Sequence, residues 1–418
     1  MMIVSFILLV AVFSFFSLST IALLQRKEYR LDRLWVYLTE SFEWNDFFFR
    51  RPVWTLKTVL IFTLTLIMLL TTGLGFAGVI TLMFFLASLG LVFFLVLMQI
   101  LIKRATILLA SHKLKHAHLL VIGVTGSFGK TGTKEMIATL LSEKFNVFKT
   151  PQHVNTDYGI ARVILSDLLS EHEVFVVEMG AYHVGEIASI CRMVRPKIGV
   201  LTGINEQHLA LFGSIENTMK AKGELVDALL PGGVVFFNED DERVARIAER
   251  FTGKKFVFSG KKGNQAAAIA VARHFGLSDA EMTHGLEKLP KDSIPFKKGF
   301  NGATFLDDSY SSNPTGFSFA LDILAEQKGR KIIVTSGIIE LGSSRERVHR
   351  ELGEKIKSIG ALLIVTNSSF ADLFGVDRWC QSTDDEKILA FLSKQLTKED
   401  TVLVEGRISA YLMKGLGL

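Results

Sequence analysis

The feature that most constrains this chain is a long stretch without charge. No Asp, Glu, Lys or Arg interrupts the sequence from Val59 to Ile102. A helix needs about 20 apolar residues to cross the core of a bilayer, so this stretch is too long for a single span. Three glycines lie near its middle: Gly73, Gly75 and Gly78. The pattern predicts two membrane helices, over 57–75 and 78–102, joined by a tight turn.

A second uncharged stretch, Met1 to Gln25, opens the chain and is followed by Arg26 and Lys27. No basic residue precedes it and no small-residue cleavage motif follows it, which argues against a signal peptide. We therefore predict a first span over 1–25, and an α-helical membrane domain of three spans over 1–117.

The distribution of basic residues predicts the orientation of these spans. Lys and Arg are frequent in the loop after the first span and in the segment after the third, whereas the turn between the second and third spans has none. Basic residues favour the inner side of a membrane. We expect a multi-pass protein of the cytoplasmic (inner) membrane, with the rest of the chain facing the cytoplasm.

Charge and cysteine content exclude several kinds of function. The formal net charge is only +5, and no stripe of Lys and Arg with interleaved aromatics is present, so no nucleic-acid partner is expected. The two cysteines, Cys191 and Cys380, are distant in sequence. They provide neither a disulfide framework nor a cysteine-rich zinc site, which fits a reducing cytosol.

From residue 118 onward, short apolar runs alternate with helical patterns. The predicted strands are 118–124, 174–177, 198–201, 234–237, 304–306, 332–334, 362–365 and 402–404. The predicted helices are 131–143, 264–289, 315–327, 344–358 and 385–394. This alternation predicts an α/β fold with mostly parallel sheets. We expect a central phosphate-loop (P-loop) domain over 118–290 and a Rossmann-like C-terminal domain over 291–418.

A glycine-rich loop lies between the first predicted strand and its helix. Gly126 and Gly129 allow backbone amides to surround a phosphate, and the following helix adds positive charge at its N-terminus. Lys130 offers a charge to the outer phosphates, and Thr131 a hydroxyl to Mg²⁺. Three further polar residues follow predicted strands: Glu178, His208 and Asn238. Because ligands collect at the carboxyl ends of parallel strands, these features predict one site.

Several segments together resemble the Mur ligase family. The glycine loop, Gly123-Val-Thr-Gly126-Ser-Phe-Gly129-Lys130-Thr131, has the family's spacing. The other similar segments are Val177-Glu-Met-Gly-Ala181, Gly203-Ile-Asn-Glu-Gln-His208, Ala221-Lys-Gly-Glu224, Asn238-Glu-Asp-Asp241, Asp307-Asp-Ser-Tyr-Ser-Ser-Asn-Pro314, Glu340-Leu-Gly342 and His349-Arg-Glu-Leu-Gly353. The resemblance covers 118–418 and is strongest to the MurF branch, whose members add D-alanyl-D-alanine to a peptidoglycan precursor.

The resemblance implies an ATP-dependent acid–amino-acid ligase that forms ADP and uses ATP and Mg²⁺. It assigns nucleotide binding to Gly126, Ser127, Gly129, Lys130, Thr131, Gly132, Asn238, Asp308 and Asn313. It assigns the metal to Thr131, Glu178 and His208, and catalysis to Lys130, His208 and Lys222. Lys222 falls where many Mur ligases carry a carbamylated lysine.

The chain also departs from the family pattern. Membrane spans occupy the place of the domain that binds the UDP portion of the precursor. Ser311-Ser312 replaces Asn-Ala, and Val404-Glu405-Gly406-Arg407 stands where MurF usually has Val-Lys-Gly-Ser. The phosphate machinery is intact, but these changes leave the substrate open.

We therefore expect a membrane-anchored ligase that joins an amino acid or dipeptide to a cell-wall peptide precursor, either lipid-linked or UDP-linked, through an acyl phosphate. Alternatives are a ligase of the poly-γ-glutamate type, a pseudomurein peptide ligase, and a catalytically weak ATP-binding scaffold of the cell envelope. The sequence predicts no oligomeric state.

Overall fold

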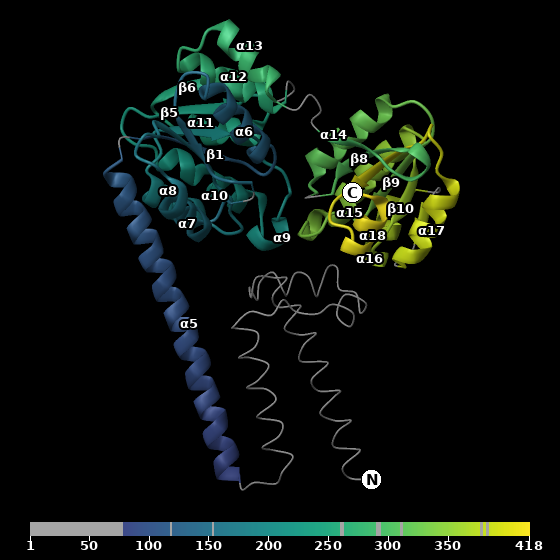
Figure 1. Ribbon diagram of the computed structural model, residues 1–418, viewed down its shortest axis with the longest axis horizontal. Coiled ribbons are helices and arrows are strands. Elements are labelled where there is room, and N and C mark those ends of the chain that lie inside the picture. Colours follow the sequence, from purple (N-terminus) through teal and green to yellow (C-terminus); the bar gives the residue numbers. More distant parts are fainter. Residues whose placement is uncertain are drawn as a thin grey trace. The chain divides into compact units, whose positions relative to one another are not determined.

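The computed structural model describes residues 78–117, 119–152, 154–259, 263–289, 294–309, 312–376, 379–381 and 384–418 (Figure 1). The chain divides into two compact units, Met1–Ala105 and Thr106–Leu418. The predicted spans over 1–25 and 57–75 lie outside the described residues. The third predicted span falls on helix α5 (Gly78–Lys115), which extends beyond the predicted end. Within the described residues, no helix has the length and apolar character that crossing a bilayer requires.

The last turns of α5 pack on the domain that follows. Ala110 is fully buried in a core cluster, and Ile107 and Leu114 pack against the same cluster. Lys113 donates a hydrogen bond from Nζ to the carbonyl oxygen of Ile164, at 2.9 Å. The end of α5 therefore belongs to the packed structure of the middle domain. Whether the domain boundary lies at residue 117 stays a prediction.

The middle domain is an α/β fold on a six-stranded sheet with the order β2-β3-β1-β4-β5-β6. Its strands are β1 (Leu120–Thr125), β2 (Val147–Lys149), β3 (Val174–Glu178), β4 (Ile198–Leu201), β5 (Val234–Asn238) and β6 (Lys254–Phe258). Its helices are α6 (Lys130–Leu141), α7 (Asp157–Asp167), α8 (Glu186–Val194), α9 (Leu209–Phe212), α10 (Ile215–Asp227), α11 (Glu242–Glu249), α12 (Asn264–His274) and α13 (Asp279–Glu287). Every strand pair is parallel, as predicted.

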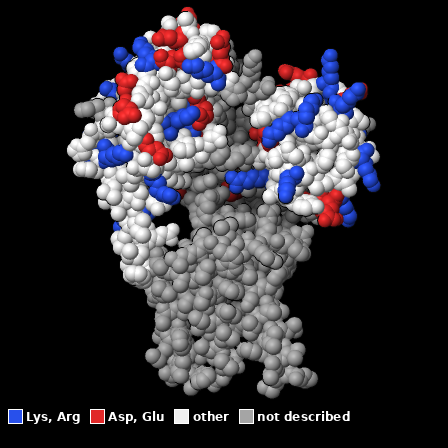
Figure 2. Space-filling model, in the orientation of Figure 1, with Lys and Arg blue, Asp and Glu red and all other residues white. Residues whose placement is uncertain are grey.

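Both faces of the middle sheet are covered, which explains why its central strands are apolar throughout. Ile122 and Val124 of β1 point into a cluster with α6 and α12, whereas Val121 points into a cluster with α7, α8 and α10. Figure 1 shows these two groups of helices on the domain. Over its described surface in Figure 2, Lys and Arg side chains lie interspersed with Asp and Glu.

One predicted element is wrong in extent. The helix expected over 264–289 is two helices, α12 and α13. Gly276, with φ of 70°, takes the left-handed conformation that ends a helix. Ser278 and Glu281 then form a capping box that starts the next one. The composition on both sides of Gly276 favours helix, and a single glycine does not by itself mark a helix end, since Gly285 lies inside α13.

The C-terminal domain has a second six-stranded sheet, with the order β11-β10-β9-β12-β8-β7. Its strands are β7 (Phe296–Lys298), β8 (Thr304–Asp308), β9 (Lys331–Thr335), β10 (Leu362–Val365), β11 (Trp379–Gln381) and β12 (Thr401–Glu405). Its helices are η2 (Phe300–Gly302), α14 (Pro314–Glu326), η3 (Gly342–Ser344), α15 (Arg345–Ser358), α16 (Ser368–Ala371), η4 (Asp372–Phe374), α17 (Asp385–Gln395) and α18 (Ala410–Leu416). The sheet is mixed rather than purely parallel, because β7 runs antiparallel to β8 at one edge.

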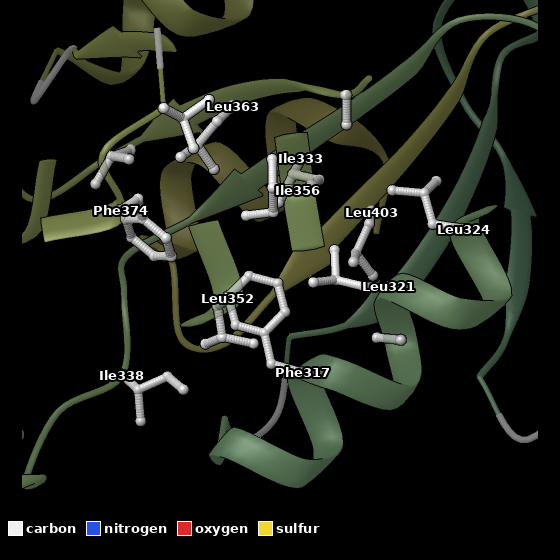
Figure 3. Packing of buried hydrophobic residues seen from close by; sticks show 14 of the residues in the cluster. Phe317, Leu321, Leu324, Ile333, Ile338, Leu352, Ile356, Leu363, Phe374 and Leu403 are labelled. Atoms are coloured by element: carbon white, nitrogen blue, oxygen red, sulfur yellow. The ribbon is translucent and has the colours of Figure 1, made fainter. Parts of the chain in front are cut away.

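The core of this domain fixes the ends of β8 and β12. Phe317 and Leu321 of α14 lie fully buried beside Leu403 of β12, and Leu352 of α15 packs into the same cluster (Figure 3). Burying each such side chain stabilises the fold by about 1.5–3 kcal/mol. Helices α14 and α15 thereby hold one face of the sheet, and the polar residues at the strand ends gain a rigid support.

Candidate active site

The glycine loop has the backbone that a phosphate cradle requires. It connects β1 to α6, and its Gly126 and Gly129 have φ of 157° and 75°. A Cβ atom on Gly126 would lie 2.0 Å from Oγ1 of Thr202, so no larger residue fits. No side chain caps the N-terminus of α6. The first amides of this helix are therefore available to an anion. That the loop binds phosphate stays a prediction.

The end of β4 holds the loop in place. The amide of Ser127 donates to the carbonyl oxygen of Gly203 at 2.6 Å, and Oγ1 of Thr202 donates to that of Phe128 at 2.5 Å. Oγ of Ser127 also donates to the carbonyl oxygen of Asn205, at 3.4 Å. These hydrogen bonds fix the conformation of the glycine loop against the residues that follow β4.

Lys130 lies over the loop, since its Nζ donates to the carbonyl oxygen of Ser127 at 3.1 Å. Burial lowers the pKa of Lys130, and the charge of Glu178 acts in the opposite direction. The side chain of Asn264 lies close beside the same helix, because a Cβ atom on Gly132 would come within 2.3 Å of its Nδ2. The loop thus carries the cation of Lys130. It is packed against the residues after β4 and against Asn264, which leaves no room for a side chain at Gly132.

Glu178 is buried at the end of β3, in register with Val124 of β1. Its Oε1 accepts a hydrogen bond from Nδ2 of Asn155 at 3.1 Å. Its Oε2 lies 3.7 Å from Nζ of Lys134 and has no hydrogen-bond partner. A buried carboxylate oxygen without a hydrogen bond, beside a phosphate loop, fits a cation ligand.

The site fits Mg²⁺ with few protein ligands. Among the described residues, no group of three or more His, Cys, Asp or Glu side chains lies together in a way that could hold a metal ion. Mg²⁺ usually keeps several waters and is bound by one or two carboxylates and by substrate phosphates. Thr131 and Glu178 are the residues that would hold it. The assignment of His208 to a metal stays a prediction.

His208 contacts the C-terminal domain. Its Nδ1 lies 2.5 Å from Oε2 of Glu340, and its ring meets that of Tyr182 edge-on at 4.7 Å. Burial is the main cause that lowers the pKa of His208. The Glu340 carboxylate raises this pKa, whereas the charges of Lys130 and Lys222 lower it. His208 is therefore close enough to both lysines to feel their charge.

Lys222 is 3% exposed and lies on α10. Its Nζ is 5.7 Å from the centre of the Phe212 ring, and in the described part of the chain it forms no salt bridge. Burial lowers the pKa of Lys222 well below its usual value, and the charge of Lys130 lowers it further. Three carboxylates act the other way: Glu186, Glu224 and Glu178. A lowered pKa supplies the neutral amine that a reactive lysine needs.

Asn238, the last residue of β5, forms two hydrogen bonds through its side-chain amide. Its Nδ2 donates to the carbonyl oxygen of Thr202 at 3.1 Å, and its Oδ1 accepts from the amide of Asp240 at 3.1 Å. The nearby Asp241 accepts from the amide of Ile204 at 2.7 Å. These bonds tie the ends of β4 and β5 together. That Asn238 faces adenine stays a prediction.

The two predicted site residues of the C-terminal domain, Asn313 and Asp308, lie on different elements. Asn313 caps α14 and also accepts, through Oδ1, a hydrogen bond from Nδ2 of Asn205 at 2.9 Å. It therefore connects this domain to the segment that supports the phosphate loop. Asp308 lies at the end of β8, in register with Glu405 of β12. Their contacts with nucleotide stay predictions.

Sequence reasoning missed several residues that build the site. Thr202 and Asn205 support the loop. Thr202 carries the same signal as Glu178, because it follows directly on the buried strand β4, whereas Asn205 lies three residues further on. Asn155 and Lys134 contact Glu178, but no strand-end pattern marks them. Lys134 is fully buried although it lies on a helix whose pattern is otherwise amphipathic.

Comparisons with known proteins agree with this geometry. Residues 124–303 match the family model described as the Mur ligase middle domain, and residues 295–408 match that of the Mur ligase, glutamate ligase domain. Among curated relatives, the UDP-N-acetylmuramoyl-tripeptide–D-alanyl-D-alanine ligase of Synechocystis sp. is 29% identical, over 70% of this chain and 72% of the relative.

Solved structures give the same result. MurF from Acinetobacter baumannii aligns with a TM-score of 0.67 and 26% identity, over 75% of this chain and 79% of that one. The MurF ligase from Thermotoga maritima, in complex with ADP, aligns with a TM-score of 0.66 and 26% identity, over 75% and 82%. This chain therefore belongs to the Mur ligase family and carries the middle and C-terminal domains of a MurF-like, ATP-dependent acid–amino-acid ligase.

Proposed function

We propose that the protein is a membrane-anchored ligase that joins an amino acid or dipeptide to a cell-wall peptide precursor through an acyl phosphate. The observation that carries this proposal is the grouping of Lys130, Glu178, His208 and Lys222 at one edge of the middle sheet. The charge of Glu178 raises the pKa of Lys130 and of Lys222, and the charge of Lys130 lowers the pKa of Lys222 and of His208. The Synechocystis relative, a UDP-N-acetylmuramoyl-tripeptide–D-alanyl-D-alanine ligase, supports a peptide precursor and a dipeptide as substrates.

The first step activates the acid. Its carboxylate attacks the γ-phosphorus of ATP, an acyl–phosphate bond forms, and the bond to ADP breaks. Negative charge spreads over the transferring phosphoryl group, and fixed donors aimed at that charge lower the barrier. The amides at the start of α6 and the ammonium of Lys130 are such donors. Mg²⁺, held by Thr131 and Glu178, would supply further neutralisation.

The second step forms the amide. A neutral amine attacks the acyl carbon, a C–N bond forms, and phosphate leaves with the proton that the nitrogen loses. Water must be kept away from the acyl phosphate meanwhile. Several contacts connect the C-terminal domain to the segment after β4, among them Asn205 with Asn313 and His208 with Glu340. These contacts support closure of the domains over the activated acid.

Membrane anchoring rests on the sequence and on α5. The uncharged stretches predict three spans. In the described part of α5 the apolar side chains from Phe94 to Ile102 include several that are about half exposed, and basic residues follow at Lys103 and Arg104. Because the third predicted span runs on into the middle domain in the sequence, an anchor there would keep the ligase near lipid headgroups. A lipid-linked precursor is then a suitable acceptor.

The test is ADP formation by the full chain in nanodiscs. Lipid-linked and UDP-linked peptide precursors are each offered with amino acids, including glutamate, and with D-alanyl-D-alanine. We expect turnover that requires both an acid and an amine, and preference for the lipid-linked acceptor. Turnover on UDP-linked acceptors alone would refute the lipid-linked proposal. Absence of any acceptor-dependent ADP formation would favour the scaffold instead.

The variant Lys130→Ala tests the catalytic site independently of membrane anchoring. We expect this variant to lose ADP formation and to remain in the membrane fraction after alkaline extraction. The orientation is tested on the same vesicles by protease digestion from one side. Protection of residues 118–418 in inside-out vesicles would contradict a cytoplasmic catalytic part.

A further inference from the structure

Helix α6 carries a second lysine, Lys134, that takes no part in the proposed acyl-phosphate steps. Its side chain is fully buried. Its Nζ lies 3.7 Å from Oε2 of Glu178 and 3.1 Å from Oε1 of Glu135. It also donates a hydrogen bond to the carbonyl oxygen of Pro151, at 3.3 Å. Lysine is rarely fully buried unless it is paired, so the two carboxylates hold this ammonium group inside the domain.

The position of Lys134 places its charge at the expected metal site. Thr131 and Lys134 are three residues apart on α6 and therefore lie on the same face of the helix. Helix α6 packs against β3, the strand that ends at Glu178. Among the described residues, Lys134 alone forms an ion pair with this carboxylate. The carboxylate that would hold Mg²⁺ together with Thr131 thus already has a cation beside it.

The two oxygens of Glu178 are held in different ways. Its Oε1 accepts a hydrogen bond from Asn155, and its amide donates to Oγ1 of Thr150 at 3.1 Å. Its Oε2 has no hydrogen-bond partner, because 3.7 Å to Lys134 is too long for one. Lys134 therefore compensates the charge of Oε2 but leaves its lone pairs open, which is the state that a metal ligand needs.

The same charge opposes a metal ion that arrives alone. A buried carboxylate without a compensating cation is unfavourable, and Lys134 meets this need when no metal is bound. A divalent cation at Oε2 of Glu178 would be repelled by the ammonium group, since like charges this close interact strongly even at an effective dielectric constant of about 20. Lys130 adds to the repulsion, because its charge also interacts with Glu178. The phosphates of a nucleotide supply the negative charge that offsets it.

Glu135 balances part of the charge of Lys134. Its Oε1 lies 3.1 Å from Nζ of Lys134, whereas its Oε2 pairs with Lys149. The Glu135 side chain is 27% exposed, so it can be changed with little risk to the fold. Removing this carboxylate leaves the charge of Lys134 to act on Glu178 alone. Variants of Lys134 and of Glu135 should therefore change metal binding in opposite directions.

We propose that Lys134 is the resident counter-ion of Glu178 and makes metal binding depend on bound nucleotide. The inference rests on the proposed ligase function and concerns the regulation of its metal site. Lys134 touches neither substrate nor metal, so it is a positioning residue that acts through Glu178. Once phosphates reach the amides at the start of α6, Glu178 can take up the metal together with the nucleotide. Without nucleotide, the pair of Glu178 and Lys134 keeps divalent cations out.

The experiment measures binding of Mn²⁺ alone, without nucleotide, to the full chain in nanodiscs. Electron paramagnetic resonance counts the free ion, in mildly alkaline buffer where carboxyl groups are ionised. Lys134→Met removes the charge and keeps a similar length. We expect it to bind Mn²⁺ at least about tenfold more tightly than the wild type. A role of Lys134 in packing alone predicts the reverse, because Glu178 would lose its fixed position and bind Mn²⁺ more weakly.

Glu135→Gln is the second variant, and it should weaken nucleotide-free Mn²⁺ binding about threefold or more. The matched control for Lys134→Met is Lys144→Met, which removes an exposed lysine beyond the end of α6. The control for Glu135→Gln is Glu143→Gln, which removes a carboxylate with its own lysine partner. Both controls should bind Mn²⁺ like the wild type. ADP binding in EDTA, measured by calorimetry, verifies that each variant keeps its phosphate loop.

Three results would overturn the proposal. One is Mn²⁺ binding by Lys134→Met that is equal to or weaker than that of the wild type, with ADP binding intact. Another is tightened binding that persists when Glu178→Gln is added to Lys134→Met, because the metal would then bind elsewhere. The third is unchanged or tighter binding by Glu135→Gln, which decides the matter if Lys134→Met does not fold. Failure of the ligase function is a separate result, namely no ADP formation with any acid and amine.

Discussion

Nδ1 of His208 lies 2.5 Å from Oε2 of Glu340, and the amide of Ala210 donates to the carbonyl oxygen of the same glutamate at 3.0 Å. Both His208 and Glu340 have positive φ, 60° and 65°. Residues other than glycine adopt this conformation rarely, and such positions cluster at functional sites. The two turns therefore hold unfavourable backbone conformations at the point where the middle and C-terminal domains contact each other.

Replacing Glu340 with Gln should lower the pKa of His208. The Glu340 carboxylate raises that pKa, so its loss leaves burial and the charges of Lys130 and Lys222 to act alone. Proton NMR titration of the ring measures the shift. We also expect kcat/KM to fall about tenfold, because the contact between the domains loses an ionic hydrogen bond. An unchanged pKa of His208 would show that the two side chains do not interact in solution.

Replacing Lys222 with Arg should reduce kcat about 100-fold. The lowered pKa of Lys222 supplies a neutral amine, whereas arginine stays protonated at all accessible pH values. If Lys222 acts as a carbamate, wild-type activity should rise with bicarbonate and that of the variant should not. The matched control is Lys220→Arg, two residues earlier on the same helix and exposed. Equal activity of Lys222→Arg and the wild type would remove Lys222 from the mechanism.

Much of the fold could be predicted because buried parallel strands are continuous apolar runs. The sequences of strands β1, β3, β4 and β5 are such apolar runs, and the polar residues at their carboxyl ends lie at one edge of the sheet. The short edge strands β2, β7 and β11 were missed, since three residues carry no measurable period. Strand β6 was missed because its exposed lysines hide its pairing with β5.

Contacts between the domains could not be predicted from the pattern. His208 and Glu340 are 132 positions apart, and Asn205 and Asn313 are 108 apart. Their meeting depends on how two separately folded sheets approach, and no local periodicity encodes that. The departure at Glu405 was visible in the sequence, but the burial of its carboxyl group was not. Only the structure shows that the carboxyl group is fully buried opposite Asp308.

His349 should make the C-terminal domain sensitive to acid. It is fully buried; its Nδ1 donates to the carbonyl oxygen of Arg345 at 2.7 Å, and its Nε2 accepts from the amide of Ile338 at 3.0 Å. Burial lowers its pKa to about 4. An unfolded histidine has a pKa of about 6.5, so the folded state favours the neutral ring.

The sign of the pH effect follows from this depressed pKa. The stabilisation is complete above pH 6.5 and is lost as the pH falls from there to about 4, by roughly 3 kcal/mol in total. His349→Gln should lower the stability at pH 7 and flatten its dependence between pH 6.5 and 4. Urea unfolding of the full chain in detergent measures this.

Replacing Gly126 with Ala should abolish nucleotide binding. The added Cβ would lie 2.0 Å from Oγ1 of Thr202 and 3.0 Å from the backbone of Gly203, so the loop must move away from the end of β4. The loop amides then lose the positions that surround a phosphate. We expect the Kd for ADP to rise at least about 100-fold, measured by calorimetry.

Gly232→Ala is the control, because Gly232 has φ of 73° but open space around it. It shares the backbone penalty of about 1 kcal/mol without the collision. Equal loss of ADP binding in both variants would mean that general destabilisation, rather than the shape of the phosphate loop, is responsible.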